Sequence, residues 1–186
     1  MTLPVVNASP SRAGLVPTLI AVPIGVALMT LAAKLQLPFW PVPMTLHTMA
    51  VMGFALFLGP RLAVSICLAY LAAGAAGLPV FSGTPERGIG LAYMMGPTGG
   101  YLAGFLLASA LVGMLAEGRT VLGRLAAMLA GLGLVYACGL AWLALFVPVP
   151  KLLSVGVLPF LLGDLLKIAV LALASLALPR RSGGAR

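Results

Sequence analysis

The chain has 186 residues, 62% hydrophobic and 8% charged, with a formal net charge of +8. A soluble domain carries about 25% charged residues, so this composition excludes a soluble globular protein and predicts one that folds in a bilayer. The basic residues are spread singly between apolar blocks rather than clustered on one face, which excludes a nucleic-acid-binding protein.

Six apolar blocks predict six transmembrane helices. Prolines, glycines or charged residues separate the blocks, and a full span needs about 20 apolar residues. The second and third blocks are shorter, so we expect tilted or shielded helices, with a re-entrant pair as the alternative. We expect a polar tail at 1–13, a transmembrane domain at 14–178 and a basic tail at 179–186. The blocks run at 14–36, 44–58, 62–77, 96–116, 121–147 and 152–178.

The basic residues are divided unevenly between the two sides of such a protein. With six spans both termini share one side, and the excess of bases there predicts that this side is cytoplasmic. The opposite side holds Lys34, Arg87 and Lys151, while Lys167 lies within a span. The side with the termini holds seven bases: Arg12, Arg61, Arg119, Arg124, Arg180, Arg181 and Arg186.

Two connections on the outward side have unusual compositions. The first, 37–43, reads LPFWPVP and carries Phe39 and Trp40, which suit the aromatic belt of a membrane interface. The second, 78–95, is the longest connection and mixes aromatic residues with Ser82 and Arg87. A long connection with hydrophobic content is often a lid or binding loop, and an ordinary surface loop is the alternative.

Two stretches of small residues predict close helix contacts. GPTGGY at 96–101 begins the fourth span, and the small residues that continue from Gly100 with four-residue spacing suit either helix packing or a close approach of backbone to a ligand. In the first span Ala21, Gly25 and Ala33 lie at four-residue multiples along one stripe. This stripe indicates a face for another helix, such as that of a partner subunit.

Asp164 and Lys167 are charged residues inside the last apolar block. A charge at a bilayer centre costs about 2.5–3.5 kcal/mol on insertion scales. The three-residue spacing places both on one helix face, where each partly neutralises the other. The pair predicts a solute or proton site, with a structural ion pair as the alternative. His47 is either a satisfied polar residue or a ligand-binding one; because it is the only histidine and acids are scarce, we expect no metal site.

Five stretches together resemble the BioY family of biotin transporters, the substrate-binding (S) components of energy-coupling-factor (ECF) importers. They are PVPMTLHTMAV at 41–51, LGPRLA at 58–63, YLAAGAAGLPVFSG at 70–83, GPTGGYLAGF at 96–105 and FLLGDLLK at 160–167. The resemblance implies an all-α membrane protein whose six helices form an S-component-like bundle in a bacterial cytoplasmic membrane. It also implies biotin binding from outside, no catalytic residues and no cofactor.

The resemblance implies two kinds of partner besides lipid. One is an ECF module, made of a transmembrane coupling protein and two ATPases, which would dock on Ala21, Gly25 and Ala33. The other is a second copy of the chain, because some members are thought to transport without a module. The chain itself has no Walker motif, so we expect ATP hydrolysis only on the partner ATPases.

The matching residues also imply a biotin site. Asp164 accepts the ureido N–H groups of biotin, and Lys167 donates to the ureido carbonyl or keeps Asp164 ionised. His47 stands where the family pattern has glutamine, and Arg87 is assigned to the valerate carboxylate from its position rather than from a motif. The predicted site residues are Phe39, Trp40, Thr45, His47, Phe81, Ser82, Arg87, Tyr101, Asp164 and Lys167.

Three other functions are compatible with these residues. The first is an S component for another vitamin. The second is an intramembrane enzyme with Asp164 as general base, and the third is a proton-coupled carrier in which Asp164 titrates. A panel of competing vitamins distinguishes the first of these, chemical turnover of the ligand the second, and sensitivity to a protonophore the third.

Overall fold

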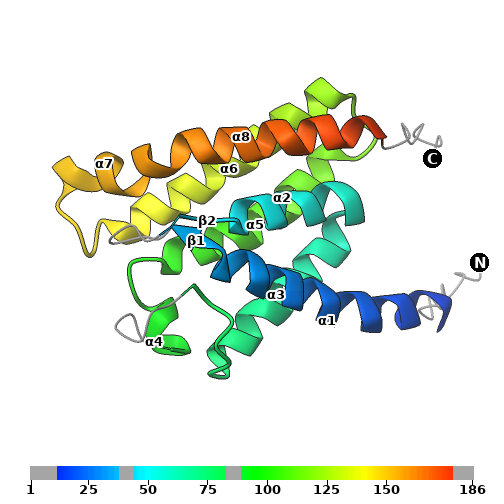
Figure 1. Ribbon diagram of the computed structural model, residues 1–186, viewed down its shortest axis with the longest axis horizontal. Coiled ribbons are helices and arrows are strands. Elements are labelled where there is room, and N and C mark those ends of the chain that lie inside the picture. Colours follow the sequence, from blue (N-terminus) through cyan, green and yellow to red (C-terminus); the bar gives the residue numbers. More distant parts are fainter. Residues whose placement is uncertain (1–11, 38–43, 83–88, 178–186) are drawn as a thin grey trace, which may run out of the picture.

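The computed structural model describes residues 12–37, 44–82 and 89–177. Helices dominate this part of the chain, as the sequence predicts (Figure 1). Two short 3₁₀ segments, η2 (Val149–Lys151) and η3 (Ser175–Ala177), flank the last two helices. The helices are α1 (Arg12–Lys34), α2 (His47–Leu58), α3 (Pro60–Ala75), α4 (Leu91–Met94), α5 (Gly99–Ala116), α6 (Val121–Leu143), α7 (Leu152–Gly156) and α8 (Leu158–Ala174).

Among the described residues, three helical stretches are long and apolar enough to cross a membrane: Gly99–Ala116, Val121–Leu143 and Val149–Ala177. In the same part of the chain, the apolar helical segments Thr18–Lys34, His47–Leu58 and Pro60–Ala75 are shorter. At about 1.5 Å of rise per residue, the twelve residues of α2 extend about 18 Å, well below the hydrocarbon thickness of about 30 Å. The shortness predicted for the second and third blocks is therefore real.

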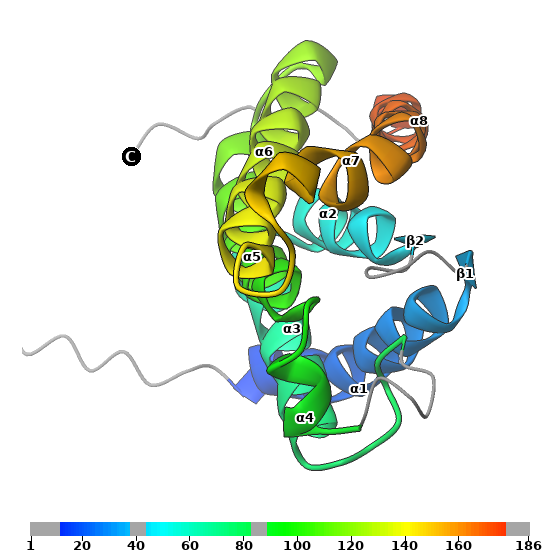
Figure 2. The same cartoon turned by 90° about the vertical axis from the view of Figure 1, so that its left-hand side faces the viewer.

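The bundle places α2 and α5 between two outer groups of helices. In both views α1 and α3 lie on one side and α6 and α8 on the other (Figures 1 and 2). α1 begins and α8 ends at the same end of the molecule. A two-stranded antiparallel ribbon, β1 (Gln36–Leu37) and β2 (Met44–Thr45), connects α1 to α2. This ribbon brings the end of α1 beside the start of α2.

The stripe of small residues in α5 packs directly against α6. A Cβ atom at Gly104 would lie 2.9 Å from the Cα atom of Val135, and one at Gly100 would collide with Trp142. The indole Nε1 of Trp142 donates a 2.9 Å hydrogen bond to the carbonyl of Gly96. Helix packing, one of the two predicted roles of this stripe, is therefore confirmed.

The sequence suggested a single helix for the last apolar block, but the structure divides this block into two helices. α7 ends at Gly156, and α8 begins at Leu158 with Pro159 in its first turn. Val157 lies between them with φ −129° and ψ −57°, outside helical geometry. A proline is compatible with the first turn of a helix but not with its interior, so Pro159 separates the two segments.

Candidate functional site

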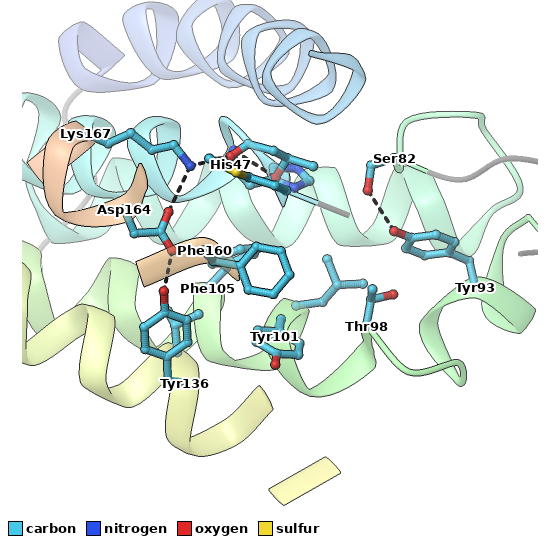
Figure 3. Close-up of a pocket in the computed structure, with 14 residues that line it drawn as sticks. His47, Ser82, Tyr93, Thr98, Tyr101, Phe105, Tyr136, Phe160, Asp164 and Lys167 are labelled. Carbon is cyan, nitrogen blue, oxygen red and sulfur yellow. Dashed lines mark hydrogen bonds and ion pairs between the residues drawn. The ribbon is translucent and has the colours of Figure 1, made fainter. Parts of the chain in front are cut away.

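A cavity lies among α2, α5, α6 and α8 (Figure 3). It offers about 50 Å³ to the centres of water-sized molecules, and one water needs about 10–15 Å³ of such space. The cavity therefore holds a few waters in this conformation. Its lining consists of Met44, Thr45, His47, Ser82, Tyr93, Thr98, Tyr101, Leu102, Phe105, Val135, Tyr136, Phe160, Asp164 and Lys167.

The charged end of the cavity is a hydrogen-bonded network centred on Asp164. Lys167 Nζ lies 2.9 Å from Asp164 Oδ1, and the phenol of Tyr136 donates a 2.7 Å hydrogen bond to Oδ2. Lys167 also donates a 2.6 Å hydrogen bond to the carbonyl of Thr45. Asp164 is 4% exposed and Lys167 8% exposed. The ion pair that the sequence spacing predicts is thus formed and buried, with partners from α6 and β2.

Among the described residues, the bonds of this network leave hydrogen-bonding capacity on both Lys167 and Asp164. An ammonium has three N–H donors, of which Lys167 uses two, on Asp164 and on Thr45. A carboxylate offers about four lone-pair positions, of which the Asp164 bonds to Lys167 and Tyr136 use two. The remaining capacity is one donor and two acceptor positions. A planar group with one carbonyl between two N–H groups complements this set.

Ser82 and Tyr93 form the hydroxyl end of the cavity. The two hydroxyl groups share a 2.8 Å hydrogen bond. Phe81 is 4% exposed and stacks on Tyr93, with ring centroids 5.0 Å apart. Its ring also packs edge-on against Tyr70 and fills the space beside Gly74. Phe81 does not line the cavity in this conformation, and its predicted contact with a ligand stays a prediction.

Aromatic rings occupy the space between the two polar ends. Figure 3 shows Phe105, Phe160 and Tyr101 between Asp164 on one side and Ser82 on the other. The hydroxyl of Tyr101 donates a 2.8 Å hydrogen bond to the carbonyl of Gly156, the last residue of α7. This bond uses the hydroxyl for holding α7, so Tyr101 offers the cavity mainly its ring.

His47 contributes an unsatisfied nitrogen to the cavity wall. Its side chain is 3% exposed and packs against Tyr70 and Phe105, with ring centroids 5.2 Å and 5.3 Å away. Within the described residues, its buried Nε2 has no hydrogen-bond partner. A buried nitrogen without a hydrogen bond lowers stability by about 1–3 kcal/mol, so a hydrogen bond from this atom to a ligand or a water is favourable.

The structure brings six of the predicted site residues to one cavity: Thr45, His47, Ser82, Tyr101, Asp164 and Lys167. Phe39, Trp40 and Arg87 lie in 38–43 and 83–88, outside the described residues. Sequence reasoning missed Tyr136 and Tyr93. Tyr136 carries a hydroxyl group in the middle of an apolar block, and this polar group is the signal that could have identified it.

The predicted docking stripe is only partly on the surface. Ala21 and Gly25 line an open, almost wholly apolar groove of about 820 Å³ between α1 and α2. A Cβ atom at Gly25 would lie 2.5 Å from Ile66 Cδ1, so this glycine also lets α1 approach α3. Ala33 is 0% exposed. Neighbouring residues cover Ala33 and it does not line the groove, so its docking role stays a prediction.

Comparison with known proteins gives consistent results. The BioY family model matches residues 7–183. The biotin transporter BioY of Thermotoga maritima is 40% identical over 156 residues, which cover 83% of this chain and 90% of that protein. The probable biotin transporter BioY of Pyrococcus horikoshii is 40% identical over 144 residues, 77% of this chain and 85% of that protein.

A solved structure agrees with these sequence relatives. The crystal structure of the S-component for biotin from an ECF-type ABC transporter has a TM-score of 0.77 and 27% sequence identity. The match covers 89% of this chain and 92% of that one. The predicted all-α S-component bundle is confirmed, and the related proteins are transporters rather than enzymes. With a family match over almost its whole length, the chain is a multi-pass membrane protein that belongs to the BioY family.

Proposed function

We propose that this protein binds biotin and takes it up across the cytoplasmic membrane as the S component of an ECF transporter. The observation that carries the proposal is the remaining hydrogen-bonding capacity of the buried network of Asp164, Lys167 and Tyr136. The ureido ring of biotin has two N–H donors and one carbonyl acceptor, and this capacity consists of two acceptor positions and one donor. Charge-assisted hydrogen bonds in a buried site are about twice as strong as neutral ones.

The rest of the cavity suits biotin bound with its ureido ring at the charged end. The apolar thiophane ring suits the space beside Phe105 and Phe160, and the valerate chain then points toward Ser82 and Tyr93. We assign the valerate carboxylate to Arg87, which follows Ser82 closely in sequence. A cavity with room for a few waters is smaller than a bicyclic vitamin, so binding requires the walls to move apart.

The test is titration calorimetry of the purified, ligand-free protein with biotin. Tight one-to-one binding supports the proposal. Asp164→Asn should weaken binding by about 1.5–3 kcal/mol, because the amide keeps the shape but loses at least one charge-assisted bond. Glu117→Gln is the matched control, since Glu117 is an exposed acid at the end of α5. Absence of binding in a folded, monodisperse preparation contradicts the proposal, and unchanged affinity of Asp164→Asn contradicts the site assignment.

We further propose that both termini face the cytoplasm of a bacterial cell and that an ECF module drives release of biotin inward, with no cofactor on this chain. The open apolar groove beside Ala21 and Gly25 is the proposed docking face for the coupling protein. Uptake by cells should then stop on ATP depletion and persist with a protonophore when ATP is maintained. The opposite pattern indicates a proton-coupled carrier, and uptake without any module indicates a chain that acts alone or as a homo-oligomer.

A further inference from the structure

The last turn of α1 is bonded to the segment that forms the hydroxyl end of the cavity. Lys34 Nζ donates a 2.8 Å hydrogen bond to the carbonyl of Phe81, a residue 47 positions later in the chain. Phe81 directly precedes Ser82, whose hydroxyl lies at the cavity with that of Tyr93. Lys34 is not a cavity residue, so whatever it does to a ligand is transmitted through Phe81.

The segment 80–82 is held from two sides. The phenol of Tyr70, on α3, donates a 3.1 Å hydrogen bond to the carbonyl of Val80. Lys34, on α1, holds the next carbonyl, that of Phe81. Tyr70 is completely buried, whereas Lys34 is exposed. The bond from Lys34 is therefore one that solvent can replace, while the bond from Tyr70 is built into the core.

The same end of α1 also fixes the opposite, charged end of the cavity. The amide of Leu46 donates a 3.1 Å hydrogen bond to the carbonyl of Ala32, and Gln36 pairs with Thr45 in the ribbon. The carbonyl of Thr45 in turn accepts the bond from Lys167. The backbone thus sets the distance from α1 to the charged end. The Lys34 side chain links the same helix to the hydroxyl end.

We propose that Lys34 is a positioning residue that keeps the segment 80–82 against the cavity and thereby slows the escape of bound ligand. The bond joins α1 to the segment beside Ser82, and we expect this segment to move away from the cavity when a ligand leaves. Loss of the bond should therefore lower the barrier to dissociation more than it changes the rate of association. The inference rests on the proposed binding of biotin.

The test compares Lys34→Met, Lys34→Arg and Lys151→Met with the natural protein in lipid nanodiscs. Bound radiolabelled biotin is chased with excess unlabelled biotin, and the dissociation rate is recorded. Biotin should dissociate from Lys34→Met about threefold to tenfold faster than from the natural protein, which is the range expected for the loss of one net hydrogen bond. Lys34→Arg keeps a charged donor and should restore most of the natural rate. Lys151→Met removes an equal charge from a different connection, η2, and should leave the rate unchanged.

A second readout does not depend on biotin. Hydrogen exchange of the amides of Val80 and Ser82 in the empty protein should be faster in Lys34→Met than in Lys151→Met. An unchanged dissociation rate in Lys34→Met, or equal acceleration in Lys151→Met, overturns the proposal. If the natural protein binds no biotin, the proposed function fails, and the exchange experiment alone decides on Lys34. Unaltered exchange in Lys34→Met then overturns the inference.

Discussion

His47 combines a tightly packed ring with a nitrogen that has no hydrogen-bond partner among the described residues. The ring touches Tyr70 and Phe105, and its Nε2 is buried. His47 also lines the cavity, together with several polar groups. A buried group that is left unsatisfied in the empty protein lowers stability, and binding a ligand removes that penalty. The unmet hydrogen bond thus favours the liganded state over the empty one.

This arrangement predicts opposite effects of His47→Leu on stability and on binding. The empty protein should unfold at a higher temperature in detergent, because an unsatisfied buried nitrogen is removed and apolar packing against Phe105 is kept. Biotin binding should weaken by about 0.5–1.5 kcal/mol, the net value of one hydrogen bond. His47→Gln, which restores a polar group, should recover binding. A lower unfolding temperature with unchanged affinity would assign His47 a packing role only.

Asp164 and Lys167 could be predicted as site residues because a charge in an apolar block is rare and costly, and their spacing alone places them together. Tyr136 stands out as a hydroxyl-bearing residue in an apolar block, but its pairing with Asp164 could not be predicted, because the bond joins residues 28 positions apart. The bond from Lys167 to the carbonyl of Thr45 spans 122 positions. Partners that far apart are decided by how helices pack, and no local spacing records that. Phe81 was predicted as a ligand contact, and its ring packs against Tyr70 and Tyr93, contacts that the sequence spacing does not reveal.

At the scale of secondary structure, the ends of helices depart most from the sequence prediction. The boundaries of the apolar blocks gave the helices approximately, because prolines and glycines mark them. The division of the last block into α7 and α8 was missed, although Pro159 was visible. Both segments belong to one continuous apolar stretch, so hydropathy does not mark the break between them. The prediction also treated Arg124 as a topological charge only.

Arg124 instead joins the start of α6 to the end of α8. It is 6% exposed, and its Nη1 donates a 2.6 Å hydrogen bond to the carbonyl of Ser175. A cation at a helix C-terminus also interacts favourably with the helix dipole. The same residue lines a pocket of about 200 Å³ beside the C-terminal ends of α2 and α5. Arg124 therefore stabilises the end of the bundle that lies away from the ligand cavity.

Replacing Arg124 should consequently separate stability from binding. Arg124→Met should destabilise the protein by about 1.5–3 kcal/mol through loss of a charge-assisted hydrogen bond. The thermal unfolding midpoint in detergent should fall, and biotin affinity below that midpoint should stay the same. Arg119→Met is the control, because Arg119 is an exposed base in the same connection. Equal melting temperatures for the two variants would show that the bond to Ser175 is dispensable.

The two ends of the molecule differ in the helices that reach them. α1 begins and α8 ends at one end, near the connection from α5 to α6, while α4 and α7 lie toward the other (Figure 1). The ligand cavity is lined by Tyr93 of α4 and by Tyr101. The hydroxyl of Tyr101 is hydrogen-bonded to the end of α7. The cavity is therefore nearer the end opposite the termini. If the termini are cytoplasmic, as the distribution of basic residues predicts, the site belongs to the outer half.

This orientation can be measured with single cysteines on either side of α6. Cys67→Ala and Cys138→Ala first remove the two native thiols. Arg119→Cys and Lys151→Cys then introduce exposed thiols before and after the 23 residues of α6, a length sufficient for one crossing. A membrane-impermeant maleimide on intact cells should label Lys151→Cys alone, and permeabilised cells should label both.

The outcomes of this labelling test separately whether α6 crosses the membrane and which side of it the cavity is nearer. Labelling of both variants in intact cells would mean that α6 does not cross the membrane. Labelling of Arg119→Cys alone would invert the protein and place the cavity in the cytoplasmic half, where external biotin has no direct access. The expected result leaves the charged network deep in the bundle with the hydroxyl end toward the outside. A vitamin arriving from outside would then meet Ser82 and Tyr93 before its ureido ring reaches Asp164.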